Sequence, residues 1–330
     1  MARKLELTLA CGDYEIVRAL KDGSIEADGI ELNVLTDMDS SSRHWRMIRN
    51  REFDVCELSG SSYLMAKDRG QPFTAIPVFL HRRFRHGFVF INTSKGIEKP
   101  ADLNGRRIGL KTYQATAILY LRGLLAEEYG VDPTTVEWVT ELEEEIPFET
   151  PPGISLSRAP DGADISDMLA EGEVDAVIHP DIIAPILERD PRVARLWTDY
   201  RAEEEAYFRR TGIFPIMHAT AIRNEILEAH PWVANNLAQA FQRAKFAAYR
   251  RMSNPRIVPL AWFLDEWDAQ RELLGPDPWE YGLTEGNRKN LDMLIRYSRD
   301  AGLISNLSSV DDFYTDVMLK SRGRGEWAAH

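Results

Sequence analysis

The chain has 330 residues, 44% of them apolar, and a formal net charge of −12 at pH 7. This length and apolar content are sufficient for two domain-sized hydrophobic cores. An acidic chain repels nucleic acids and anionic lipid surfaces, so we expect neither a nucleic acid nor a membrane as a partner.

The first residues do not have the pattern of an export signal. The apolar run from Leu5 to Ala10 is too short for the core of a signal peptide, and no small-residue cleavage motif follows it. Only two cysteines, Cys11 and Cys56, are present, which implies no disulfide framework. We therefore expect a cytoplasmic protein.

Short apolar strands alternate with helical patterns along the chain, which is typical of an α/β protein with largely parallel sheets. The first group of expected strands is Glu6–Cys11, Glu31–Leu35, Asp54–Leu58, Thr74–Val78 and Gly87–Asn92. The second group is Arg107–Leu110, Thr135–Val139, Ala176–Ile178 and Pro215–Ile222. Apolar residues at helical spacing predict helices over Ser61–Arg69, Ala115–Tyr129, Ile165–Glu171, Pro231–Met252 and Asn287–Ala301.

The two groups of strands predict two lobes. We expect lobe 1 to comprise residues 1–90 and 220–330, with the C-terminal helices, and lobe 2 to comprise residues 91–219. The chain would cross between them at His86–Pro100 and at Phe214–Arg223. Two crossings form a hinge, and a ligand cleft is expected at the carboxyl ends of the strands, sized for a compact organic anion.

The segment Glu57 to Ser62 ends a strand and begins a helix on small hydroxyl residues. Free N–H groups at a helix start attract anions, and the Ser61 and Ser62 hydroxyls add donors. Simple capping of the helix by a serine is an equally good interpretation.

The run His81 to Gly87 is rich in cationic and titratable side chains within an acidic chain. Arginine matches carboxylates with two parallel hydrogen bonds, so Arg83 and Arg85 are candidates for substrate binding. Strand alternation would place them on one face, with His86 on the other. A solvated turn is the competing interpretation, and Arg82 is expected on the surface.

The return segment Tyr207 to His218 carries Arg210 and Phe214, which we expect to contact the substrate. His218 lies in an apolar run, where a histidine is often a satisfied core residue. Its position at the predicted crossing makes a role in the cleft equally plausible.

Two loops of lobe 2 supply further candidates. Lys111, Tyr113 and Gln114 lie between a strand and a helix, and His179 follows the strand Ala176–Ile178. The ordinary pKa of histidine suits His179 to proton transfer near neutral pH. Helix capping or loop packing would equally account for both segments.

Several familiar signatures are missing from the sequence. It contains no glycine-rich phosphate loop, no His-Glu-x-x-His zinc motif and no Gly-x-Ser-x-Gly elbow, so we predict no metal site. The histidines His44, His230 and His330 have no evident role in a cleft.

The sequence resembles the 4,5-dihydroxyphthalate decarboxylase family over nearly its whole length. The resemblance is carried by Phe53–Met65, Ala75–Phe79, Phe84–His86, Ser166–Asp175, Arg210–His218 and Trp279–Gly282. It implies a two-lobed, periplasmic-binding-protein-like fold of type 2. It also implies decarboxylation of 4,5-dihydroxyphthalate to protocatechuate in phthalate breakdown, without an organic cofactor, by a homo-oligomer.

The residues then take roles in that reaction. Protonating the ring carbon that bears the carboxylate requires an acid there and a base at a hydroxyl. We expect His86, His179 or His218 to transfer protons, Arg83 and Arg85 to hold carboxylates, and Tyr113 and Gln114 to orient the ring.

Two positions depart from the family pattern, namely Thr112 in place of a glutamate and Asp181 in place of an arginine. The loss of a cation should change which acid binds. The alternatives are a non-catalytic solute-binding or sensor protein for a small aromatic carboxylate, or a related enzyme acting on another acid.

Overall fold

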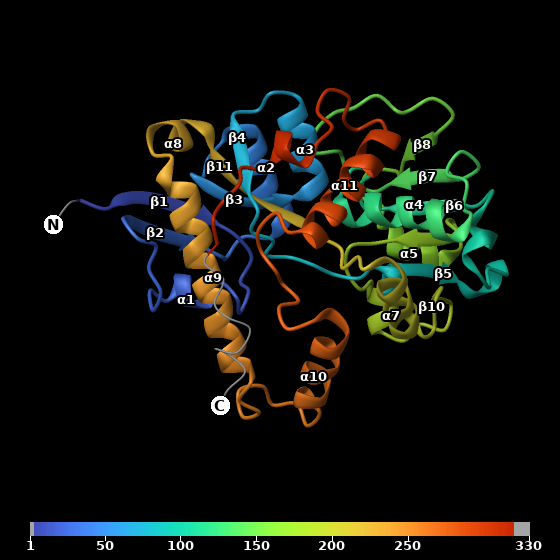
Figure 1. Ribbon diagram of the computed structural model, residues 1–330. Coiled ribbons are helices and arrows are strands. Elements are labelled where there is room, and N and C mark those ends of the chain that lie inside the picture. The colour runs from blue at the N-terminus through green and yellow to red at the C-terminus, as the bar shows by residue number, and fades with distance from the viewer. Residues whose placement is uncertain (1–2, 320–330) are drawn as a thin grey trace. The chain divides into compact units, whose positions relative to one another are not determined.

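The structure is a computed structural model that describes residues 3–319. The chain forms two compact units (Figure 1). Unit 1 contains the residues up to Arg82, Ile216–Leu291 and those from Ser309 on, and unit 2 contains Arg83–Pro215 and Asp292–Ser308. These bounds differ from the expected lobes in the placement of residues 83–90, 216–219 and 292–308.

Unit 1 is built on a five-stranded sheet in the order β2-β1-β3-β11-β4. Strand β1 pairs in parallel with both β2 and β3, whereas β11 is antiparallel to both β3 and β4. The strands are β1 Leu5–Ala10, β2 Ile30–Leu35, β3 Val55–Ser59, β4 Phe73–Ile76 and β11 His218–Arg223.

Helices cover this sheet, and the longest, α9 (Trp232–Met252), lies against it (Figure 1). Val233, Leu237 and Phe241 repeat at helical spacing and join Leu7 and Leu9 of β1 in one buried cluster. This amphipathic pattern predicted the helix correctly. The other helices are α1 Arg18–Lys21, α2 Ser40–Asn50, α3 Gly60–Asp68, α8 Asn224–Ala229, α10 Phe263–Leu274 and α12 Val310–Phe313.

Unit 2 contains a six-stranded sheet in the order β10-β5-β9-β6-β7-β8, in which β5 is antiparallel to both neighbours. Its strands are β5 Val89–Asn92, β6 Arg107–Leu110, β7 Glu137–Thr140, β8 Ser155–Arg158, β9 Ala176–Ile178 and β10 Val193–Arg195. Its helices are α4 Thr116–Tyr129, α5 Ile165–Glu171, α6 Ala184–Leu187 and α7 Tyr200–Thr211, and α11 (Glu285–Asp300) begins in unit 1 and ends in unit 2.

The predicted α/β class is confirmed, but the sheets are mixed rather than largely parallel. Strands β8 and β10 and helices α1, α2, α6, α7, α8, α10 and α12 were not predicted. The strand β8 and the helix α7 bury little: all of β8 is at least partly exposed, and Tyr207 is the one buried residue of α7. Within residues 3–319, every helix is too short or too polar to cross a membrane.

Candidate active site

The candidate active site lies at one edge of the unit 1 sheet. Strands β1 and β3 run in parallel and end there, and β11 begins there because it is antiparallel to β3, with His218 opposite Ser59. Helix α3 also starts at this edge. The fold therefore gathers polar groups that are distant in sequence.

Glu57, on β3, is the centre of this group, and its side chain is fully buried. Its Oε1 accepts hydrogen bonds from the Tyr14 hydroxyl at 2.9 Å and from His218 Nδ1 at 2.7 Å. Its Oε2 accepts from the Gly12 N–H at 2.8 Å and from Arg43 Nη2 at 2.9 Å. Four donors therefore compensate a charge that burial alone would make very costly.

Gly12 is required for this arrangement. A Cβ atom at this position would lie 2.5 Å from the ring of Tyr14, which is too close for any side chain. The absence of a side chain at Gly12 thus lets the Tyr14 ring pack against the backbone, where the Gly12 N–H and the Tyr14 hydroxyl both reach Glu57.

The charge states follow from these contacts. Burial raises the pKa of Glu57, but the hydrogen bond from His218, the charge of Arg43 and the hydrogen bond from the Gly12 N–H act in the opposite direction, and the net pKa lies well below the ordinary range. Burial is also the largest influence on His218, and it lowers the pKa of the imidazole while Glu57 acts in the opposite direction. Glu57 is therefore ionised, and His218 is neutral near pH 7.

The hydrogen bond to Glu57 also fixes the tautomer of His218. Because an ionised carboxylate only accepts, Nδ1 must carry the proton, and Nε2 is left with a basic lone pair. The side chain is 13% exposed, so part of the ring reaches the surface of unit 1. An oriented, neutral imidazole beside a buried carboxylate is suited to general base chemistry.

Two more histidines surround this ring. His81 and His44 pack edge-on to His218, with ring centroids 4.7 Å and 5.3 Å away. The ring of Tyr14 lies 6.2 Å from that of His81. We found no role for His44 in a cleft from the sequence, and the structure places its ring against that of His218. His330 lies outside the described residues.

Ser61 and Ser62 lie in the first turn of α3, at the same sheet edge, and both are buried. The Ser62 Oγ has no hydrogen-bond partner among residues 3–319. A buried hydroxyl at a helix start is a donor available to an anion, whereas a capping serine would already be engaged with the helix backbone.

Arg82, Arg83 and Arg85 differ in their surroundings. Arg82 is buried and donates to the Glu280 carbonyl at 2.9 Å, so its expected surface position was wrong. Arg83 is exposed and Arg85 is buried, which contradicts the expected strand alternation. Both guanidinium groups nevertheless lie over the ring of Phe88, at 5.3 Å and 5.1 Å from its centroid.

Arg85 also approaches the His179 loop of unit 2. Its Nη1 donates to the Pro180 carbonyl at 2.7 Å, and burial is the main cause that lowers the pKa of Arg85 to about 9. His179 Nδ1 lies 3.0 Å from both the N–H and the carbonyl oxygen of Asp181, and burial lowers the pKa of His179. Asp181, one of the two departures from the family pattern, thus contacts His179 through its backbone, a contact that does not depend on the side chain.

His86 lies in an aromatic pocket of unit 2, with the rings of Trp197, Tyr207 and Tyr129 at 5.1, 5.4 and 6.0 Å. Burial lowers the pKa of His86 to about 4. Its Nδ1 lies 3.9 Å from Glu204, whose pKa burial raises to about 7. His86 is therefore neutral, and Glu204 is a titratable group that sequence analysis missed.

The loop residues Lys111, Tyr113 and Gln114 have partners within unit 2. Lys111 forms an ion pair with Glu141. The N–H groups of Tyr113 and Gln114 donate to the carboxylate of Glu144 at 2.6 Å and 3.1 Å. Both side chains are buried, and the Tyr113 ring stacks on Phe148 with centroids 5.4 Å apart.

Arg210 and Phe214 have different partners in unit 2. Arg210 is half exposed and forms an ion pair with Glu128 at 2.7 Å. Phe214 is buried and packs on Phe84, with ring centroids 4.8 Å apart. The structure therefore gives Arg210 a surface partner and Phe214 an aromatic one.

One signal in the sequence could have revealed the group around Glu57. Glu57 lies in the otherwise apolar or small strand Val55–Ser59, and a carboxylate in a buried strand must have donors nearby. The signal does not identify those donors, because Arg43, Tyr14 and His218 reach it only through the tertiary fold. Among residues 3–319, no three histidine, cysteine, aspartate or glutamate side chains are placed to hold a metal ion.

Comparison with known proteins gives consistent results. Residues 15–146 match the family described as NMT1/THI5 like. The putative periplasmic sulfonate-binding protein SsuA of Methylobacillus flagellatus has the same fold, with a TM-score of 0.58 at 12% identity over 96% of this chain and 93% of that one. SsuA of Escherichia coli gives a TM-score of 0.55 at 12% identity, over 98% and 95%. The predicted type 2 fold is thereby confirmed.

Two relatives are close enough in sequence to establish the family. The 4,5-dihydroxyphthalate decarboxylase of Comamonas testosteroni is 36% identical over 328 residues, which covers 96% of this chain and 98% of that protein. The protein of the same name from Pseudomonas putida is 36% identical over 213 residues, 62% of this chain and 82% of that protein. The chain therefore belongs to the 4,5-dihydroxyphthalate decarboxylase family.

Proposed function

We propose that the protein removes carbon dioxide from a hydroxylated aromatic acid, with 4,5-dihydroxyphthalate, converted to protocatechuate, or a close analogue as its substrate. The observation that carries this proposal is the buried Glu57–His218 pair, which presents a neutral imidazole with a free basic nitrogen. Membership of a decarboxylase family supplies the reaction class.

In the proposed mechanism, His218 Nε2 takes the proton of the hydroxyl para to the departing carboxylate. The oxygen then donates electron density into the ring, the carbon bearing the carboxylate accepts a proton, and carbon dioxide leaves as aromaticity returns. His81, which packs on His218, is our candidate within unit 1 for the second proton transfer. The first turn of α3, with Ser61 and Ser62, is our candidate for binding a carboxylate.

The candidates in unit 2 remain part of the proposal. Arg83 and Arg85 are suited to a carboxylate by their chemistry, and His86 and His179 stay candidates for proton transfer. Each is tested separately by Arg83→Gln, Arg85→Gln, His86→Asn and His179→Asn, with turnover and substrate affinity measured for each variant.

The first experiment measures carbon dioxide release from hydroxylated benzoates and phthalates. We expect turnover of acids with a hydroxyl para to a carboxylate, and binding without turnover of unsubstituted phthalate. His218→Asn should abolish turnover while the substrate still binds. Equal turnover of phthalate would refute a mechanism that begins at the hydroxyl.

A pure binding protein is the second candidate, because the two solved structures compared above are described as sulfonate-binding proteins. Tight binding of an aromatic acid without carbon dioxide release would favour it. Thr112→Glu and Asp181→Arg, which restore the family residues, should show whether the two departures change the substrate. A cytoplasmic location and a homo-oligomer remain predictions, to be checked by cell fractionation and light scattering.

A further inference from the structure

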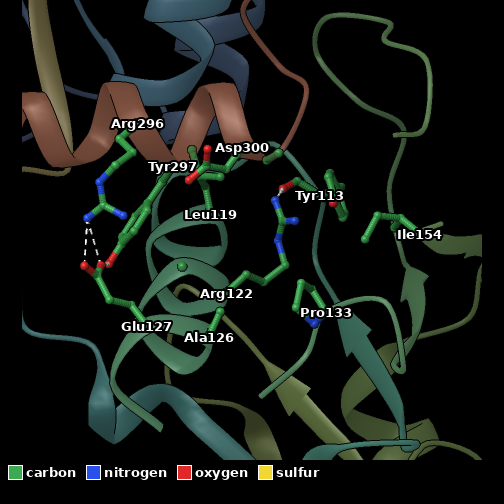
Figure 2. A pocket seen from close by; sticks show the side chains of 12 residues that line it. Tyr113, Leu119, Arg122, Ala126, Glu127, Pro133, Ile154, Arg296, Tyr297 and Asp300 are labelled. Carbon is green, nitrogen blue, oxygen red and sulfur yellow. Dashed lines mark hydrogen bonds and ion pairs between the residues drawn. The ribbon is translucent and has the colours of Figure 1, made fainter. Parts of the chain in front are cut away.

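Unit 2 contains a cavity of about 380 Å³ that is separate from the residues assigned roles above, apart from Tyr113 (Figure 2). Helix α4 and the last turns of α11 form two of its sides, and the loops that carry Tyr113, Pro133 and Ile154 complete it together with Ala301. Its apolar lining consists of Leu119, Ala126, Pro133, Ile154 and Ala301. The volume is sufficient for a molecule of single-ring size.

Arg122 of α4 lines this cavity although it is only 6% exposed. Figure 2 shows its side chain extending towards Tyr113, whose carbonyl accepts from Nη2 at 2.9 Å. The guanidinium carbon lies 3.4 Å from the centroid of the Tyr113 ring. Among residues 3–319, Nε has no hydrogen-bond partner and no carboxylate lies within ion-pair distance of the guanidinium.

Two of the acidic groups nearby, Glu127 and Glu144, accept hydrogen bonds from other residues. Glu127 accepts from Arg296 at 2.8 Å and from the Tyr297 hydroxyl at 2.5 Å, as Figure 2 shows for Arg296. Glu144 accepts the N–H groups of Tyr113 and Gln114. Glu144 interacts with Arg122 electrostatically but forms no ion pair with it among residues 3–319, so the buried guanidinium has no carboxylate in direct contact, a costly state that a bound carboxylate would relieve.

The cavity is also shaped by close packing of its two helices. A Cβ atom at Gly123 would lie 2.5 Å from the Tyr297 ring, so only glycine lets the ring pack so closely on α4. Tyr297 in turn positions the hydroxyl that binds Glu127. Of the residues that line the cavity on α4, Ala126 is exposed, so it lies on the solvent side, whereas Arg122 is buried.

We propose that this cavity binds a small organic monocarboxylate, with the carboxylate on Arg122 and an apolar body against Leu119, Pro133 and Ile154. A monoanion is favoured over a dianion because Glu127 and Asp300 also line the cavity. The site is independent of the proposed reaction and would serve to bind an effector or a product.

The test uses benzoate as the probe and phthalate as the dianionic comparison, titrated into the full-length protein with methyl-labelled isoleucine. The Ile154 methyl signal should move with benzoate and much less with phthalate, while Ile222 of the unit 1 core should not move. Arg122→Met should weaken benzoate binding roughly 10- to 100-fold, since a hydrogen bond to a charged group is lost. Arg122→Lys should weaken it less.

Two further variants keep the test decisive. Ala126→Trp leaves Arg122 in place but should block the mouth and abolish the Ile154 response, which protects the test if Arg122→Met folds poorly. His218→Asn should leave that response unchanged. The proposal would be overturned if benzoate did not shift the Ile154 methyl signal of the wild type. It would also be overturned if the shift were fully retained in Arg122→Met, or lost only in His218→Asn.

Discussion

Replacing Glu57 by glutamine tests the active-site proposal most directly, because the substitution preserves shape and removes charge. In the native site each carboxylate oxygen accepts two hydrogen bonds, from Tyr14 and His218 on Oε1 and from Gly12 and Arg43 on Oε2. A glutamine has one oxygen and one NH₂ group. One of these two pairs of donors must therefore face the NH₂ group, which itself donates.

The amide has one favourable orientation. The Gly12 N–H and the Arg43 guanidinium can only donate, so the amide oxygen must face them. The NH₂ group then faces Tyr14 and His218, both of which can accept. His218 accepts on Nδ1 only if its proton moves to Nε2, and this is the tautomer that cannot act as the proposed base.

The expected effects on stability and activity differ in size. Arg43 loses a charged partner in a buried site but keeps a neutral acceptor, so the free energy of unfolding should fall by about 3 kcal/mol. Loss of a positioned general base should lower kcat by about 10² to 10⁴-fold. Urea unfolding and carbon dioxide release measure the two quantities, and nitrogen NMR of His218 reports the tautomer.

Asp54→Asn is the matched control, since this carboxylate lies directly before β3 and accepts the Thr8 N–H at 2.8 Å. It should cost about 1 kcal/mol of stability and leave kcat unchanged. If Glu57→Gln folds and retains kcat within about threefold of the wild type, a difference below about 0.7 kcal/mol, then His218 is not a base oriented by Glu57.

Three further predictions use ordinary pH and unfolding measurements. Since burial lowers the pKa of His218 and the proposed base must be neutral, kcat/KM should rise with pH to a midpoint below 6.5 and then stay level; a midpoint above 7 would contradict this. The pKa of His86 is about 4 when folded, so the unfolded chain binds the extra proton between pH 6.5 and 4 and stability falls as the pH drops. In His86→Phe, this fall in the free energy of unfolding at acid pH should be smaller by about 3 kcal/mol. An unchanged dependence of the free energy of unfolding on pH would refute the low pKa of His86. Lys245→Met should cost about 3 kcal/mol, because it leaves Asp277, 2.6 Å from the fully buried ammonium, without its cation; a loss below about 1 kcal/mol would show that Asp277 is adequately solvated.

The elements that the sequence predicted well are those that bury a regular apolar pattern. Helix α4 ends at Gly130, which adopts a φ of 68° as a C-cap, and α9 carries its apolar stripe into the core. Helix α7 escaped prediction because charged residues surround most of its circumference, so no stripe marks it. Apolar periodicity predicts an element only where that element buries an apolar face, so it gives no signal for an element that buries few residues.

The active-site group shows a different limit. The sequence pointed to Ser61, Ser62 and His218, but it did not show that His218 meets Glu57, which is 161 residues away. That meeting depends on the antiparallel register of β11 against β3, and a shift by one residue would turn His218 to the other face of the sheet. Arg43 and His44 belong to α2, a helix whose contacts with β3 no local pattern encodes.

Arg43 helps to set the charge of His218. Glu57 carries one negative charge, and the buried guanidinium 2.9 Å away already balances it, so the imidazole need not be charged. Arg43 also lowers the pKa of His218 directly. In Arg43→Met, we expect His218 to become the counter-ion of Glu57, with its pKa raised above the native value.

The two substitutions should therefore disable the same base in opposite ways. Glu57→Gln leaves His218 neutral in the unproductive tautomer, whereas Arg43→Met leaves it protonated on both nitrogens near neutral pH. Activity of Arg43→Met should recover as the pH rises through the new pKa, while Glu57→Gln should stay inactive across the same range. If Arg43→Met folds and keeps the wild-type pH profile, Arg43 has no part in setting the charge of the base, and its role is limited to holding Glu57 in place.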